Sequence, residues 1–260
     1  MVDQSGSMKA PFGAELGKTK AQGVANAINN LLYELAYQCT KGKVYRDYYY
    51  IGIVGYGGEI GLGFTGDLAG ERLQPISQIA KHPLRKELRR EKVDDGAGGV
   101  IEQTSEFPVW FDPVAKGQTL MYGAFQAAQE LIREFLGKYP HCYPPIVINI
   151  TDGKPTDKNP EPLAAALRGM ASSDGNVLLF NIHISERGER PILFPADDGN
   201  LPDEYARLLF RMSSPLPPEM LLQADASLTE GSRGFVFNAD FASVVDFLDI
   251  GTRQDKRLSQ

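Results

Sequence analysis

The sequence predicts an α/β protein whose mostly parallel central sheet is covered by helices on both faces. Three continuous apolar runs indicate strands that are buried on both sides, and they span residues 47–56, 145–153 and 176–185. Segments with a helical period of apolar residues alternate with these runs, so the strands need crossover connections. This alternation is typical of an α/β protein with a mostly parallel sheet between two layers of helices.

Two long segments carry their apolar residues on one helical face. The first has Val24, Ala27, Ile28, Leu31, Leu32 and Leu35, and the second has Leu120, Ala124, Ala127, Ala128, Leu131 and Phe135. Shorter helices are expected at 161–172, 203–213 and 240–249. The glycine-rich stretch IGIVGYGGEIGLGFTG predicts two short strands around Gly57, and therefore one antiparallel strand at the edge of the sheet.

Two stretches depart from this alternation. Residues 66–117 include the charged run KHPLRKELRREK at 81–92, for which we expect a solvated helix face, together with one or two short strands. Residues 186–233 contain PADDGNLPDE and SSPLPPE and form a second irregular stretch, which we expect to be exposed at the surface. We therefore predict a single domain over 1–250 with insertions near 66–117 and 186–233, followed by a polar tail at 251–260.

Composition excludes several classes of protein. The net charge of −6 argues against binding to nucleic acid, which needs a basic surface. No apolar run approaches the about 20 residues of a membrane-spanning helix, and no signal peptide is visible, so we expect a cytoplasmic protein. The two cysteines, Cys39 and Cys142, are too few for a disulfide framework, and we expect unreactive thiols.

Oxygen-bearing side chains stand where predicted strands end and where the second long helix begins. They are Asp3, Ser5, Ser7, Thr119 and Asp152. In extended backbone, alternate residues point the same way, so D-x-S-x-S can direct three oxygens to one place. Hydroxyls and carboxylates suit magnesium, with manganese and calcium as alternatives. The simpler alternative is a set of polar turns and helix caps that binds nothing.

The segments VDQSGSM, GQTLMYGA and NITDGKPTD resemble the three pieces of the metal-ion-dependent adhesion site (MIDAS) of von Willebrand factor A (vWA) domains. The similarity covers the chain from Asp3 to Leu248. It implies the three-layer, doubly wound, Rossmann-like fold with one antiparallel edge strand. It also implies hydroxyl ligands at Ser5, Ser7 and Thr119, and carboxylates at Asp3 and Asp152 that bind the metal directly or through water.

This resemblance implies a non-enzymatic protein–protein interaction module. A cation held mostly by neutral hydroxyls keeps an open coordination position, which an Asp or Glu of a partner protein can fill. The stretch FPVWFDPVAKGQTLMYGA is similar to bacterial intracellular members, including those linked to tellurite resistance and stress responses. Two alternatives remain open: a divalent-metal-dependent phosphoryl-transfer or hydrolytic enzyme, and a structural subunit with a vestigial site.

One feature departs from the vWA pattern. Several apolar residues normally precede D-x-S-x-S and form the central strand, but only Met1 and Val2 precede Asp3. The first central strand is therefore expected to be truncated, and we expect the native chain to begin upstream. A start codon assigned too late, or a neighbouring segment or subunit that completes the sheet, are the alternatives.

Other candidate residues have simpler explanations. The match to G-x-G-x-x-G at Gly61–Gly66 is assigned to hairpin glycines rather than to a dinucleotide site. The three histidines are scattered, which gives little support to a hydrolase, and His183 is expected to be a structural side chain within a strand. Asp157 is expected either to support the metal ligands or to be a simple loop acid.

Overall fold

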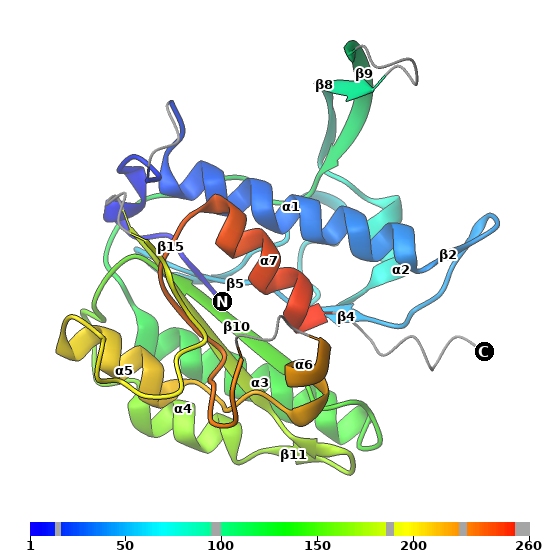
Figure 1. Ribbon diagram of the computed structural model, residues 1–260. Helices are drawn as coiled ribbons and strands as arrows, with labels where there is room; N and C mark the ends of the chain where they lie inside the picture. Colours follow the sequence, from blue (N-terminus) through cyan, green and yellow to red (C-terminus); the bar gives the residue numbers. More distant parts are fainter. Residues whose placement is uncertain (14–16, 95–99, 186–189, 224–227, 253–260) are drawn as a thin grey trace. The chain divides into compact units, whose positions relative to one another are not determined.

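The computed structural model describes residues 1–13, 17–94, 100–185, 190–223 and 228–252 (Figure 1). The chain divides into two compact units. The first unit consists of Met1–Ala27, Ile53–Gly61 and Pro113–Gln260. The second consists of Ile28–Gly52 and Leu62–Asp112. Helix α1 (Lys20–Gln38) begins in the first unit and ends in the second.

A seven-stranded sheet forms the centre of the first unit, in the order β14-β15-β13-β10-β1-β5-β6. Its strands are β14 (Ile192–Leu193), β15 (Phe235–Ala239), β13 (Leu178–Ile184), β10 (Ile146–Thr151), β1 (Val2–Asp3), β5 (Val54–Tyr56) and β6 (Ile60–Leu62). The successive pairs from β15 to β5 are parallel, whereas β14 pairs antiparallel with β15. The predicted α/β class and mostly parallel sheet are therefore confirmed.

One of the two shortest strands of this sheet lies in its interior. Strand β1 is two residues long, and Val2 lies opposite both Ile150 of β10 and Gly55 of β5. The turn between β5 and β6 is only three residues long, too short for the crossover that a parallel pair needs, so the two strands form the predicted hairpin. Strand β1 delivers Asp3 to the carboxyl edge of the sheet, between β10 and β5.

Helices cover both faces of this sheet. Helices α3 (Met121–Lys138), α4 (Glu161–Arg168) and α5 (Glu204–Met212) lie on one face, and α7 (Phe241–Thr252) lies on the other (Figure 1). Successive residues of β13 contact the two helical layers. Phe180 meets the ring of Phe247 in α7 edge-on, whereas the Asn181 amide points the other way and bonds to Ser213, directly after α5. Both faces of β13 are therefore buried, as its apolar run predicted.

A ladder of buried polar side chains joins the strands to α5. The Tyr56 hydroxyl donates to Asn149 Oδ1 at 2.7 Å, and Asn149 Nδ2 donates to Asn181 Oδ1 at 3.0 Å. Asn181 Nδ2 in turn donates to Ser213 Oγ at 2.9 Å. All four side chains are buried, so each polar group depends on these partners for its hydrogen bonds.

Removing the middle of this ladder is expected to be costly. Asn181→Ala leaves the Asn149 amide without its acceptor and opens a small void in a buried strand. We expect a loss of about 3 kcal/mol in the free energy of unfolding, measured by urea denaturation. Asn176→Ala, an exposed asparagine shortly before β13, should cost less than about 0.5 kcal/mol. Equal losses in the two variants would contradict a structural role for the ladder.

The sequence prediction for residues 47–56 was wrong in its extent. The stretch breaks into β4 (Tyr50–Ile51) and β5, and β4 pairs instead with β7 (Gln74–Pro75) inside the second unit. Gly52 marks the break, because a Cβ at this position would lie 2.8 Å from the backbone oxygen of Arg72. The backbone approaches too closely there for any other residue, and the chain changes sheets.

The second unit contains α2 (Ile76–Lys81) and three small antiparallel sheets. The largest is a ribbon of β8 (Arg85–Asp94) and β9 (Val100–Val109). A solvated helix predicted over 81–92 is therefore wrong, since β8 occupies most of that run. Cross-strand contacts replace helical ones: Lys86 Nζ lies 2.9 Å from Glu106 Oε2, and the Arg89 guanidinium lies 3.3 Å from the centre of the Phe107 ring.

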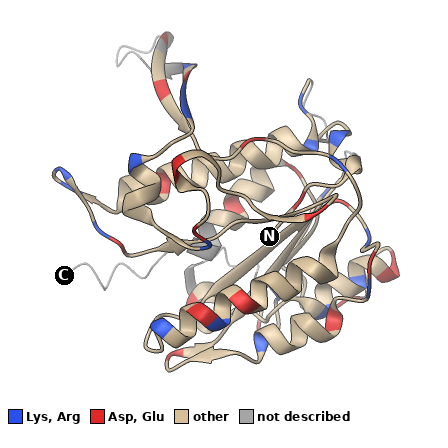
Figure 2. Cartoon of the chain, turned by 180° about the vertical axis from the view of Figure 1, so that it is seen from behind, with Lys and Arg blue, Asp and Glu red and all other residues tan. Residues whose placement is uncertain are grey.

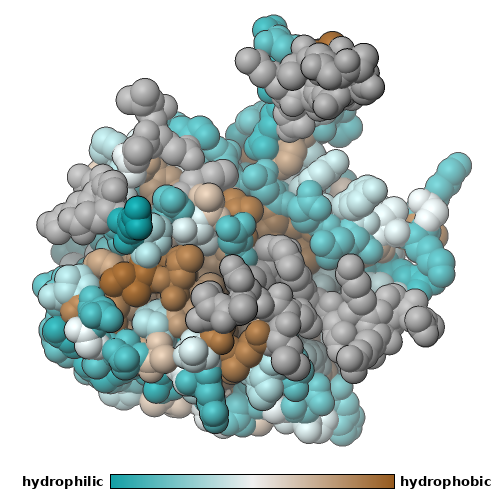
Figure 3. Space-filling model, in the orientation of Figure 1, coloured by the Kyte–Doolittle hydropathy of each residue, from teal (hydrophilic) through white to brown (hydrophobic). Residues whose placement is uncertain are grey.

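The surface of this ribbon is charged. Figure 2 shows basic and acidic residues together on its two strands, and Figure 3 shows mainly hydrophilic side chains below its grey tip. At its base, Phe107 and Val109 are buried, and the Asn29 amide is bonded to the backbone of Trp110 and Phe111. A mixture of charged and apolar residues is compatible with a strand as well as with a helix face. Here the run forms a strand because β8 pairs with β9 along ten residues.

None of the helices formed by the described residues combines the length and the apolar character needed to cross a bilayer. Cys39 is buried, and burial raises the pKa of its thiol to about 11, so this side chain is a neutral thiol near pH 7. The pKa of the Cys142 thiol is raised by burial as well. Both observations agree with the expectation of unreactive cysteines.

Candidate metal centre

The turn after β1 brings the side-chain oxygens of Asp3, Ser5 and Ser7 close to one another. Ser5 N donates to Asp3 Oδ1 at 2.9 Å, which folds the chain back over the carboxylate. Ser5 has extended backbone angles and precedes the short 3₁₀ helix Gly6–Lys9, whose Met8 side chain is buried beneath it. As a result the Ser5 and Ser7 hydroxyl oxygens lie 3.0 Å apart. The D-x-S-x-S spacing thus brings three oxygen-bearing side chains together.

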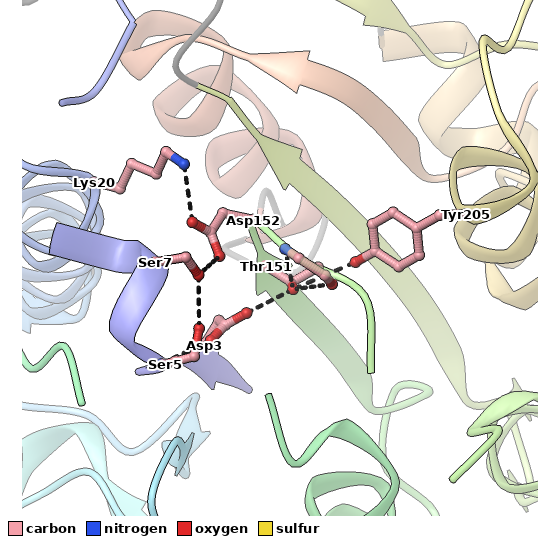
Figure 4. A network of polar contacts seen from close by, with 8 residues as sticks. Asp3, Ser5, Ser7, Lys20, Thr151, Asp152 and Tyr205 are labelled. Carbon is pink, nitrogen blue, oxygen red and sulfur yellow. Dashed lines mark hydrogen bonds and ion pairs between the residues drawn. The ribbon is translucent and has the colours of Figure 1, made fainter. Parts of the chain in front are cut away.

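The end of β10 meets this turn. Thr151 Oγ1 donates to Asp3 Oδ2 at 2.7 Å, and Ser7 Oγ donates to Asp152 Oδ1, also at 2.7 Å (Figure 4). Because β1 and β10 are parallel neighbours, their carboxyl ends lie at the same edge of the sheet. Four of the five predicted site residues, Asp3, Ser5, Ser7 and Asp152, therefore form one cluster of oxygens.

A chain of backbone hydrogen bonds brings the loop before α3 to the same edge. Lys116 N donates to the Gln4 carbonyl, Gly58 N donates to the Lys116 carbonyl, and Gly6 N donates to the Gly117 carbonyl. Gly117 has a φ of +81°, and a Cβ there would lie 2.2 Å from Gly58 N. Only glycine fits this position, because both the left-handed backbone and the close approach exclude a side chain.

This loop places Thr119, the fifth predicted residue. The Thr119 side chain is buried, and its backbone oxygen accepts from Met121 N and Thr156 N. A Cβ on Gly153 would lie 3.6 Å from Thr119 Oγ1 and 4.0 Å from Ser7 Oγ. The Thr119 and Ser7 hydroxyls therefore both lie beside the backbone of Gly153, directly after Asp152.

The spacing of these oxygens fits a small divalent ion. Octahedral ligands at about 2.0–2.1 Å from Mg²⁺ lie about 2.9 Å from their neighbours, and the same arrangement around Ca²⁺ would need about 3.3–3.6 Å. The distances from Ser7 Oγ, 3.0 Å to Ser5 Oγ and 2.7 Å to Asp152 Oδ1, are hydrogen-bond lengths in the metal-free chain, and they lie closer to the spacing around Mg²⁺ than to that around Ca²⁺. Within the described residues no group of three His, Cys, Asp or Glu could hold a metal, so the hydroxyls are essential to this candidate site.

Sequence reasoning missed Lys20, the first residue of α1. Lys20 Nζ lies 2.9 Å from Asp152 Oδ2, and the two side chains are 4% and 0% exposed (Figure 4). A signal was present in the sequence: Lys20 is in helical register with Val24 and Ala27, so a charged residue occupies the buried stripe of α1. A lysine on such a stripe needs a buried partner, and Asp152 supplies it.

Burial shifts the acid–base behaviour of the cluster. The pKa of the Asp3 carboxyl is raised by burial, which outweighs the hydrogen bonds from Ser5 and Thr151. The Tyr205 hydroxyl lies 3.4 Å from Thr151 Oγ1, and burial raises its pKa far above the usual range, so it stays neutral. Protons therefore compete with a cation for Asp3 at a higher pH than for an exposed aspartate.

Two further residues from the sequence analysis have structural roles. Asp157 Oδ1 accepts from Tyr122 N at 3.2 Å, and Oδ2 accepts from Gly123 N at 3.0 Å. Its carboxylate thus caps the first turn of α3, where negative charge is favourable. His183 Nδ1 accepts from Asn238 N at 3.2 Å, and its ring stacks on that of Phe237 with 4.5 Å between the ring centres. These contacts confirm the expected structural role.

The buried His183 predicts a pH-dependent stability. Burial lowers its pKa to about 4 in the folded protein, whereas the unfolded value is about 6.5. The unfolded chain therefore binds the proton first as the pH falls, and stability is lost between about pH 6.5 and 4. The imidazole accounts for about 3 kcal/mol of this loss. Urea unfolding at several pH values tests it: His183→Gln should have a shallower pH dependence, and an unchanged one would contradict the assignment.

Comparison of the sequence with models of protein families and with curated proteins found no match. The class of the protein is therefore defined by its fold and by its cluster of side chains. It is an α/β protein with a mostly parallel sheet, and hydroxyl and carboxylate oxygens converge at the carboxyl edge of that sheet. In open α/β sheets this edge is where ligands bind.

Proposed function

We propose that this chain is a metal-dependent protein–protein interaction module of the vWA type. A divalent cation, Mg²⁺ with Mn²⁺ or Ca²⁺ as alternatives, is held by hydroxyls of Ser5, Ser7 and Thr119, with Asp3 and Asp152 contributing directly or through water. An Asp or Glu of a partner protein completes the coordination of the cation. The observation that carries the proposal is the convergence of three neighbouring oxygens, Ser5 Oγ, Ser7 Oγ and Asp152 Oδ1, at the carboxyl edge of the sheet.

The composition of the site favours binding over catalysis. Most of its donors are neutral hydroxyls, and a cation with few anionic ligands attracts a carboxylate from outside. Two ionisable groups beside the cluster, Tyr205 and His183, are poorly suited to act as bases near pH 7. The pKa of Tyr205 is raised by burial, and His183 Nδ1 already accepts a hydrogen bond from Asn238 N. We therefore propose a binding protein and not an enzyme.

The cellular setting is a further part of the proposal. The stretch FPVWFDPVAKGQTLMYGA is similar to bacterial intracellular vWA proteins. On that similarity we place the chain in a cytoplasmic regulatory or stress-response complex, of the kind linked to tellurite resistance. The partner would be a protein and not a nucleic acid, because the net charge is −6.

A peptide-selection experiment tests the function directly. A random peptide library is selected on the purified chain in the presence of Mg²⁺. We expect the enriched peptides to share an Asp or Glu, to lose binding when that residue becomes Asn or Gln, and to be released by EDTA. Peptides that bind equally well in EDTA, or that need no carboxylate, would contradict the proposal. Ser7→Ala, which removes one hydroxyl of the site, should abolish the enrichment.

A further inference from the structure

The two oxygens of the Asp152 carboxylate have different partners. Asp152 Oδ1 faces the hydroxyl row and accepts from Ser7 Oγ at 2.7 Å. Asp152 Oδ2 is held by Lys20 Nζ at 2.9 Å. Both side chains are almost fully buried, so the pair is shielded from solvent and from salt. Figure 4 shows the ammonium group on the side of the carboxylate away from Ser7.

This pair changes the charge of the site. The two carboxylates, Asp3 and Asp152, carry −2, and Lys20 adds +1, so the metal-free cluster has a net charge of −1. A divalent cation brings it to +1, and one external carboxylate then brings it to zero. Without Lys20 the same steps give −2, zero and −1. The lysine therefore leaves the metal-loaded site with one positive charge for an external anion to neutralise.

The same pair limits how Asp152 can bind a metal. With Oδ2 engaged by the ammonium, only Oδ1 faces the hydroxyl row, so Asp152 can offer one oxygen and not two. One coordination position that a bidentate carboxylate would fill stays available. Lys20 is anchored as the first residue of α1, where its N–H donates to the Ala10 carbonyl at 2.9 Å.

We propose that Lys20 is a built-in cation of the metal site, which weakens the binding of the metal by the isolated chain and strengthens the binding of an external carboxylate to the metal-loaded site. This inference rests on the proposed function and adds the residue that sets the balance between metal and partner. It makes the two ligands cooperative: the carboxylate raises the affinity for the metal, and the metal raises the affinity for the carboxylate.

Calorimetric titration of Mg²⁺ tests the inference, carried out in chloride and in acetate buffer at matched ionic strength. Acetate serves as the probe for the external carboxylate. For the native chain we expect tighter Mg²⁺ binding in acetate than in chloride. Lys20→Met should bind Mg²⁺ about tenfold more tightly in chloride and should lose most of the acetate effect.

Three variants serve as controls. Lys20→Gln is a second neutral variant whose amide can still donate, in case the methionine variant does not fold. Lys20→Arg keeps the charge, and its affinity for Mg²⁺ should stay within about threefold of that of the native chain. Lys18→Met removes an exposed charge just before α1 and should change neither affinity nor the acetate effect.

The possible results separate the two proposals. If the native chain binds Mg²⁺ but both neutral variants bind equally or more weakly, the inference fails and the proposed function stands. If the neutral variants bind Mg²⁺ and the native chain does not, the competition by Lys20 is supported and the proposed function of the native chain fails. If neither binds, both fail.

Discussion

Asp152→Asn is expected to abolish the stabilisation of this chain by Mg²⁺. With the metal at 100 times its dissociation constant, the native chain should gain about 2.7 kcal/mol. For a chain of this size that corresponds to a rise of about 5–10 °C in Tm. The variant should show no rise, because its neutral amide replaces the carboxylate oxygen that lies 2.7 Å from Ser7 Oγ. Thermal unfolding with Mg²⁺ and with EDTA measures the difference.

This variant has a second cost that the experiment must separate from metal binding. It leaves Lys20 without its carboxylate in a buried site, and breaking such a pair costs about 3 kcal/mol or more even without metal. Ser7→Ala is therefore measured beside it, because it removes a hydroxyl and leaves the ion pair in place. Asp157→Asn is the matched control: it weakens the cap of α3 by about 1 kcal/mol and should keep the full Mg²⁺ response. A Mg²⁺ response that survives in both Asp152→Asn and Ser7→Ala would contradict the site.

Gly117→Ala should damage both the fold and the site. Alanine is strained at a φ of +81°, and its Cβ would lie 2.2 Å from Gly58 N and 2.9 Å from the Gly57 carbonyl carbon. The obstacle is the backbone of Gly57 and Gly58, so relief requires the loop before α3 to move. We expect a loss of about 3 kcal/mol or more in the free energy of unfolding. The displaced loop would carry Thr119 with it, so the Mg²⁺ response should weaken as well.

Gly137→Ala provides the control for this change. Gly137 lies on the exposed side of α3, and a Cβ there would meet nothing within 4 Å. Alanine has the higher helix propensity, so this variant should be unchanged or more stable by up to about 1 kcal/mol. Equal losses for the two alanines in urea unfolding would contradict the steric account of Gly117.

The central sheet was predictable because its strands are covered on both sides. The run 145–153 contains β10, and 176–185 contains β13, since continuous apolar residues fit a strand buried between two helical layers. The run 47–56 looked equally continuous and was not one strand. Its break at Gly52 depends on the approach of the Arg72 backbone, which is distant in sequence and invisible in the local pattern.

The charged run at 81–92 was assigned to a helix for a related reason. Its residues have good helix propensity, and nothing local opposes a helix. Strand β8 forms because β9, which begins at Val100, pairs with it and because Phe107 beneath Arg89 gives the ribbon a buried base. A strand needs a partner strand, so its stability depends on non-local contacts that a propensity cannot report.

The candidate site was predictable in its residue types and only partly in its surroundings. The spacing of Asp3, Ser5 and Ser7 and the position of Asp152 at the end of a strand predicted neighbouring oxygens, and the structure brings these four together. Lys20 was missed although its place on the apolar stripe of α1 is visible in the sequence, because its contact with Asp152 depends on the fold. The cap that Asp157 forms on α3 was hidden for the same reason.

The most direct test is a crystal structure of the chain grown with Mn²⁺, with data collected at the manganese absorption edge. Manganese binds the same oxygen donors as magnesium and can be located by its anomalous signal. We predict an anomalous peak about 2.0–2.3 Å from Ser5 Oγ and Ser7 Oγ, with Thr119 and Asp152 around the same ion. A map without a peak at these hydroxyls, or with its strongest peak elsewhere on the chain, would contradict the metal site and the function proposed from it.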